Sequence, residues 1–182
     1  MFFSSLYPQG LEKCNEALEA PVSMKDADDM LKSASDKFQE AAALALFNWG
    51  NVHMCAARKT MDGGRDPPLE EGGPPGAAIA TAEKFDDVVA RLDQAKGRYE
   101  AALGVKPDFH DASIALAQRR YERARLLCAA AGLSGDGNSP AKGHDGAKRA
   151  SEAEAEFEAA CKDFLTVLGQ LPETPAKKPE EE

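Results

Sequence analysis

The sequence predicts an all-α protein whose antiparallel helical hairpins stack into a short right-handed α-solenoid. Residues that favour helices are abundant, those that favour strands are sparse, and aromatic residues make up only 7% of the 182 residues. Long stretches carry apolar residues at helical spacing. One short pattern of small and aromatic residues also recurs along the chain, which is typical of stacked helical repeats.

Glycine and proline divide the chain into five predicted helices. They are Pro8–Glu19, Asp26–Lys59, Ala77–Val105, a helix from Asp108 or Asp111 to Ala131, and Ala147–Leu171. Asp111 is a plausible N-cap of the fourth helix. The second segment is either one long helix or two helices that meet near Ala43, and the sequence does not decide between them.

The organisation is that of one domain over residues 1–171. Residues 61–76 and 132–146 are rich in glycine and proline and lack periodicity, so we expect them to be loop insertions. Residues 172–182 are expected to form a disordered acidic tail.

The recurring pattern is Ala-x3-(Phe or Tyr)-x2-Ala. Small residues seven positions apart let a neighbouring helix approach closely, and the aromatic residue between them fills the space between hairpins. A generic amphipathic bundle does not need this fixed order. The four copies are Ala34, Phe38 and Ala41; Ala95, Tyr99 and Ala102; Ala117, Tyr121 and Ala124; and Ala153, Phe157 and Ala160.

Two segments look like the helices of a degenerate tetratricopeptide (TPR) unit. Residues 95–107 fit its second helix, which Pro107 ends, and residues 46–53 resemble its first helix, with Gly50 at the small crossing position. Trp49 is expected to be a core plug beside that glycine. We therefore add Trp49, Gly50 and Pro107 to the four alanine–aromatic copies as the predicted repeat core.

The run KFQEAAALALFNWGNVHMCAARK at residues 37–59 resembles the TPR region of the plant and green-algal Phox-like proteins (octicosapeptide–TPR, clumped-chloroplasts type). Residues 99–109, YEAALGVKPDF, are similar as well, and residues 147–170 match more loosely. The resemblance implies work with heat-shock chaperones, or linkage of organelles or myosin to the cytoskeleton. No counterpart of the octicosapeptide domain is present, so we expect a stand-alone TPR relative or a fragment.

The resemblance also suggests partner-binding residues. Asn51 matches the first asparagine of the clamp with which chaperone-binding TPRs hold a terminal carboxylate, or else it hydrogen-bonds the neighbouring helix. Independently of the resemblance, the run of basic residues Arg119, Arg120 and Arg123, with Arg125, Lys96 and Arg98, either lines a groove for an acidic peptide or forms a solvated face.

The sequence does not contain the residue patterns that nucleic-acid binding, catalysis, or metal or cofactor binding would need. The net charge of −9 and pI near 4.9 argue against nucleic-acid binding. We predict no catalytic residue, no metal site and no cofactor, because no nucleophile–base constellation, ligand cluster or phosphate loop can be assembled. No stretch is long enough to cross a membrane. The four dispersed cysteines are read as buried, reduced thiols, so a cytoplasmic location is expected.

The sequence therefore predicts a non-catalytic adaptor that holds a peptide or helix of a partner, with heat-shock chaperones as candidates. The alternative is a structural subunit fixed in a large assembly through its helices and loops. Salt separates the two predictions, because a clamp should bind an acidic peptide reversibly and more weakly as salt rises.

Overall fold

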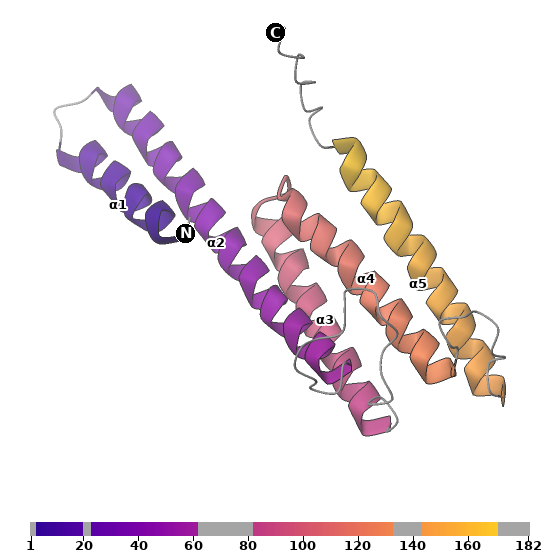
Figure 1. The fold of residues 1–182 in the computed structure, drawn as a ribbon. Helices are drawn as coiled ribbons and strands as arrows, with labels where there is room; N and C mark the ends of the chain where they lie inside the picture. The colour runs from indigo at the N-terminus through magenta and orange to yellow at the C-terminus, as the bar shows by residue number, and fades with distance from the viewer. Residues whose placement is uncertain (1–2, 20–22, 62–81, 133–142, 171–182) are drawn as a thin grey trace, which may run out of the picture.

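The computed structural model describes residues 3–19, 23–61, 82–132 and 143–170. These residues form five α-helices (Figure 1). They are α1 (Phe3–Glu19), α2 (Met24–Met61), α3 (Ala82–Val105), α4 (His110–Ala131) and α5 (Gly143–Gln170). The prediction of an all-α fold is confirmed, since the described residues contain no strand. None of these helices is both long enough and apolar enough to span a membrane.

The question that the sequence left open about residues 26–59 is settled by α2, which is one continuous helix of 38 residues. Its first half pairs with α1 and its second half with α3, while α4 lies between α3 and α5 (Figure 1). Helices that are neighbours in sequence are therefore neighbours in space. In addition, α2 and α4 make a smaller contact.

Three predicted boundaries were wrong. Helix α1 begins at Phe3 and contains Pro8, which costs one backbone hydrogen bond but does not end the helix. Asp111 is not the N-cap of α4; Phe109 holds that position without a side-chain hydrogen bond, and Asp111 lies in the first turn, where its charge suits the helix dipole. Helix α5 starts at Gly143, inside the predicted loop at 132–146.

The remaining parts of the two predicted loops and the predicted tail lie outside the described residues. The C-terminus of α4 is well defined, because Gly132 has a left-handed backbone (φ 75°) and its N–H donates to the carbonyl groups of Ala129 and Cys128.

The main core lies where α2, α3 and α4 meet. Apolar side chains from all three helices are buried together there, so this region ties the middle of the helical row into one unit. Its buried residues are Met54, Ala57 and Met61 of α2, Val88, Leu92, Ala95 and Tyr99 of α3, and Ala115 and Leu126 of α4.

The alanines of the recurring pattern mark the faces on which helices pack. All eight are buried, with at most 9% of their surface exposed. Only one of them, Ala95, belongs to the main core. An alanine has a single methyl group, which reaches only the helix that crosses directly over it, so most of these residues serve one helix pair each. The seven that lie outside the main core are Ala34 and Ala41 of α2, Ala102 of α3, Ala117 and Ala124 of α4, and Ala153 and Ala160 of α5.

Two glycines let helices cross closely. A Cβ atom added at Gly50 of α2 would overlap the ring of Tyr99 on α3, reaching 2.7 Å from its Cδ1 atom. A Cβ atom added at Gly10 of α1 would come within 2.8 Å of Cε1 of Phe38 on α2. In both cases a glycine faces the aromatic residue of the recurring pattern, so the α1–α2 and α2–α3 pairs solve the same packing problem.

Two aromatic residues of the predicted core are exposed. Trp49 is 49% exposed and Tyr121 is 38% exposed. Because α2 runs on as a single helix, the residues before Trp49 cannot fold back to cover its ring. Tyr121 lies at the edge of the α4–α5 pair, where its ring packs edge-on against Phe157. Pro107 is exposed in the turn between α3 and α4.

We predict that Gly50→Ala destabilises the protein. The added methyl group gains about 1 kcal/mol in helix propensity but forces the buried Tyr99 ring to move, which costs about 1–3 kcal/mol. Gly97→Ala is the matched control, because a Cβ atom at Gly97 meets nothing within 4 Å. In urea unfolding we expect Gly97→Ala to be neutral or stabilised and Gly50→Ala to unfold at lower urea. Equal midpoints for the two variants would contradict the close crossing.

A second prediction concerns the buried carboxylate of Glu122 on α4. It accepts a hydrogen bond from Nε of Arg58 on α2 at 2.8 Å and another from Nη1 of Arg125 at 2.7 Å. We expect Glu122→Ala to lower the free energy of unfolding by about 2–3 kcal/mol, because this carboxylate ties α4 to α2 in a buried site. Asp87→Ala, which breaks an exposed pair with Arg91, should cost less than about 1 kcal/mol. Urea unfolding of both variants measures the difference, and similar losses would show that Glu122 has no special role.

Candidate partner-binding site

Asn51, the predicted clamp residue, is engaged within the chain. The phenol of Tyr99 donates a hydrogen bond to Oδ1 of Asn51 at 2.8 Å. Burial raises the pKa of Tyr99 to about 12, so the phenol keeps its proton at neutral pH and remains a donor. The alternative prediction, a hydrogen bond between Asn51 and the neighbouring helix, is confirmed, with Asn51 as the acceptor. A clamp role for Asn51 stays a prediction.

Arg119 joins α4 to α3. Its side chain is buried, its Nη2 lies 3.0 Å from Oδ1 of Asp93, and its Nε donates to the carbonyl of Leu92 at 3.4 Å. A buried guanidinium needs such partners, because burial of an unpaired charge is costly. The structure therefore uses Arg119 to hold two helices together.

Arg120 and Arg123 face α5. Arg120 Nε lies 2.8 Å from Oδ2 of Asp163, and Arg123 Nε lies 3.1 Å from Oε1 of Glu156. The other oxygen of Glu156 is buried and accepts no hydrogen bond, but it lies 3.7 Å from Nη1 of Arg120 and 4.0 Å from Nη1 of Arg119. Glu156 thus sits among three guanidinium groups, and the three predicted partner-binding arginines are all engaged by carboxylates of this chain. Their role in partner binding stays a prediction.

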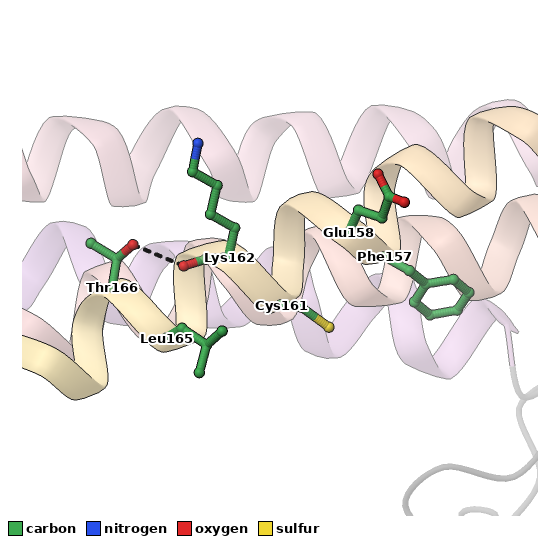
Figure 2. Close-up of a pocket in the computed structure, with 6 residues that line it drawn as sticks. All are labelled: Phe157, Glu158, Cys161, Lys162, Leu165 and Thr166. Carbon is green, nitrogen blue, oxygen red and sulfur yellow. Dashed lines mark hydrogen bonds between the residues drawn. The ribbon is translucent and has the colours of Figure 1, made fainter.

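The outer side of α5 carries an apolar stripe, which we define as Phe157, Cys161, Leu165 and Leu168. These residues are spaced by three or four positions, so they lie on one side of the helix. Figure 2 shows Phe157, Cys161 and Leu165 pointing to one side, while Glu158 and Lys162 point away. Leu165 is 70% exposed and Leu168 is 63% exposed. A hollow lies over the first three residues of the stripe, and it is open to the surroundings.

Among the described helices α5 packs mainly against α4, whose Tyr121 contacts the ring of Phe157, and Arg149 near the start of α5 also lies 5.2 Å from the Phe85 ring of α3. Leu165 and Leu168 stay mostly exposed. The sequence reasoning missed Leu165 and Leu168. Their signal was present, because a helical projection of residues 147–170 puts both leucines beside the alanine face and not on it.

A second exposed group lies on α2 and α3. The guanidinium carbon of Arg98 lies 3.5 Å from the ring centroid of Trp49, well within cation–π distance. The ring of His53, one turn along α2, stacks against Trp49 with centroids 6.4 Å apart. Lys96, which was grouped with Arg98 in the predicted basic groove, instead pairs with Glu100 at 3.6 Å.

The four cysteines are free thiols. We expected all four to be buried, but two of them are exposed. Cys55 and Cys161 are exposed, whereas Cys14 and Cys128 are partly buried. Within the described ranges, no group of three His, Cys, Asp or Glu side chains is placed to hold a metal ion.

Comparison with known proteins identifies three plant relatives. PHOX1 of Arabidopsis thaliana is 38% identical over 138 residues, which cover 74% of this chain and 17% of that protein. An HSP-interacting protein of Zea mays is 35% identical over 124 residues, which cover 68% of this chain and 16% of the relative. PHOX3 of Arabidopsis thaliana is 32% identical over 124 residues, which cover 67% of this chain and 14% of the relative.

The chain thus spans about a sixth of the length of these relatives. No protein-family model matches the sequence, and no solved structure matches it. Identities of 32–38% over two thirds or more of this chain nevertheless confirm the resemblance that its helices suggested. The chain is homologous to one segment of the plant Phox-type proteins.

Proposed function

We propose that this chain is a TPR-type protein-interaction module, an adaptor that holds a helix or peptide segment of a partner protein. The α5 apolar stripe is the observation that carries this proposal. Apolar side chains that are exposed together on one helix side gain free energy when a partner covers them. A partner helix with its own apolar stripe is the simplest complement of such a surface.

The TPR assignment rests on how the helices cross. Gly10 faces Phe38 and Gly50 faces Tyr99, and each aromatic residue lies between two buried alanines of the recurring pattern. Small residues at the closest approach, followed by a large residue that fills the remaining space, are expected for helical hairpins that stack in one repeated way. Stacking in this way would continue into a right-handed solenoid.

Heat-shock chaperones are the partners that we propose for this adaptor. The support is the homology to a protein that is named for its interaction with HSP. The proposal assigns no reaction to the chain and requires no cofactor. The four free thiols support a cytoplasmic location, where cysteines stay reduced.

A second function, that of a structural subunit in a large assembly, is favoured by the opposite end of the fold. There α1 and the first half of α2 expose several large apolar side chains, namely Tyr7, Leu11, Leu18, Met24 and Leu31. Apolar residues at both ends of a helical row are what a permanently embedded block would show. Such a subunit should be recovered in a complex of fixed stoichiometry that withstands salt, whereas an adaptor should release its partner.

The adaptor proposal predicts that Leu165→Asp and Leu168→Asp weaken binding to a purified heat-shock chaperone. Each carboxylate would have to lose its water when the partner covers it, so we expect a loss of at least about tenfold in affinity. Isothermal titration calorimetry with the full chain measures the change. Both leucines are mostly exposed, so the variants should keep the helical content and unfolding midpoint of the wild type.

Ala155→Asp is the matched control for this experiment. It adds the same charge to the same helix at an exposed position on the side away from the stripe. The control should bind the chaperone as the wild type does. If all three variants bind equally well, the α5 apolar stripe is not the docking surface. If the wild type does not bind the chaperone, the chaperone assignment is wrong.

A further inference from the structure

Trp49 and Arg98 form the closer of two cation–π contacts in the described helices; in the other, Arg149 lies 5.2 Å from the ring centroid of Phe85 and also donates to a backbone carbonyl. Trp49 is half exposed, and the guanidinium carbon of Arg98 lies 3.5 Å above its ring. A guanidinium group over an aromatic ring can still present its N–H donors to a carboxylate. The contact therefore places a cation over one face of a half-exposed aromatic ring at the surface of the α2–α3 pair.

Among the described arginines, Arg98 is the one without an oxygen partner in this chain. Seven other described arginines each make an ion pair or hydrogen bond with an oxygen of this chain: Arg58, Arg91, Arg119, Arg120, Arg123, Arg125 and Arg149. Arg98 makes neither with any described residue. The local sequence explains this, because the positions three, four and seven residues away on α3 hold Arg91, Gln94, Ala95, Ala101, Ala102 and Val105, none of which is acidic.

The surroundings on α2 are apolar or weakly basic. Ala45 lies one turn before Trp49 and is exposed, Val52 lies one turn after it and is 64% exposed, and His53 stacks on the indole ring. The chain carries a net charge of −9, yet this surface presents a cation that pairs with no described carboxylate. Its charge complement is an anionic group that lies next to an apolar one.

We propose that Trp49 and Arg98 form a second docking point, which binds a segment of a partner protein that carries an Asp or Glu carboxylate beside a large apolar side chain. The guanidinium edge takes the carboxylate in a two-point contact, and the apolar side chain covers Trp49 and Val52. This inference rests on the proposed interaction function and adds a surface and a partner chemistry to it. The docking point is separate from the α5 apolar stripe.

Trp49 is the single tryptophan of the chain, so its fluorescence reports directly on this site. The probe is a synthetic acidic–apolar peptide, Glu-Leu-Glu-Phe-Asp-Leu-Glu with blocked ends, added to the full chain at low salt. The comparison probe is the same peptide with each acid replaced by its amide. We expect the acidic peptide to shift the emission of Trp49 to shorter wavelength with a saturable curve. The amide peptide should bind at least about tenfold more weakly, because it lacks the charge-assisted contact.

The decisive variant is Arg98→Gln, which should lower the affinity for the acidic peptide at least about tenfold. Lys96→Gln is the matched control, because it removes a positive charge two positions away that already has Glu100 as its partner. It should bind the peptide as the wild type does. Arg98→Lys keeps the charge but loses the planar fork, and it should bind between the wild type and Arg98→Gln. Circular dichroism and urea unfolding check that each variant is folded.

Three outcomes would overturn the inference: no change in Trp49 emission with the acidic peptide, equal responses to the acidic and amide peptides, or unchanged acidic-peptide affinity in folded Arg98→Gln. Chaperone binding by the α5 stripe variants is measured separately. If Leu165→Asp weakens chaperone binding while Arg98→Gln leaves peptide binding unchanged, the adaptor function stands and the second docking point fails. If peptide binding depends on Arg98 while no chaperone binds, the docking point stands and the chaperone assignment fails.

Discussion

The close crossing of α2 and α3 at Gly50 and Tyr99 is the constraint on which the rest of the structure depends. Because a glycine lies under the tyrosine ring, the two helices approach closely enough for Met54, Leu92 and their neighbours to form one core. The same crossing sets the register of the residues on either side. Asn51 follows Gly50 and receives the phenol hydrogen bond, and Trp49 precedes Gly50 and meets Arg98, which precedes Tyr99. The core, the hydrogen bond between Tyr99 and Asn51, and the exposed cation–π pair therefore all depend on the small size of Gly50.

The continuity of α2 decides which surfaces remain open. A break near Ala43 would have allowed one hairpin to pack fully over the next. As a single helix, α2 instead extends beyond α3, with α1 alongside its first half (Figure 1). The exposed ring of Trp49 follows from this arrangement. At the other end, α5 is the last described helix of the row, and its stripe has α4 on one side and no described helix on the other.

The sequence was sufficient to predict the helices and the packing faces but not the surface residues. The alanine spacing is readable because a helix turns by a fixed angle per residue, so small residues seven apart share a face. Whether an aromatic residue on such a face is covered depends on where the neighbouring helix ends, and that is set by the course of α2. For this reason Tyr99 is buried as expected, whereas Trp49 and Tyr121 are not. The carboxylate partners of the α4 arginines could not be predicted for a similar reason. Asp93 and Glu156 lie on α3 and α5 and approach Arg119 only after folding.

The use of charge in this chain limits what it can recognise. Most described arginines pair with carboxylates of this chain, and three of them surround Glu156. The positive charges of α4 therefore hold helices together. An acidic protein with its cations engaged in this way repels acidic partners over most of its surface. Recognition of an acidic segment must then be local, at a cation without a carboxylate partner and beside an apolar surface that screens less than water does. Arg98 over Trp49 meets both conditions, whereas the α5 apolar stripe, with no arginine of its own, suits a partner whose contact surface is apolar.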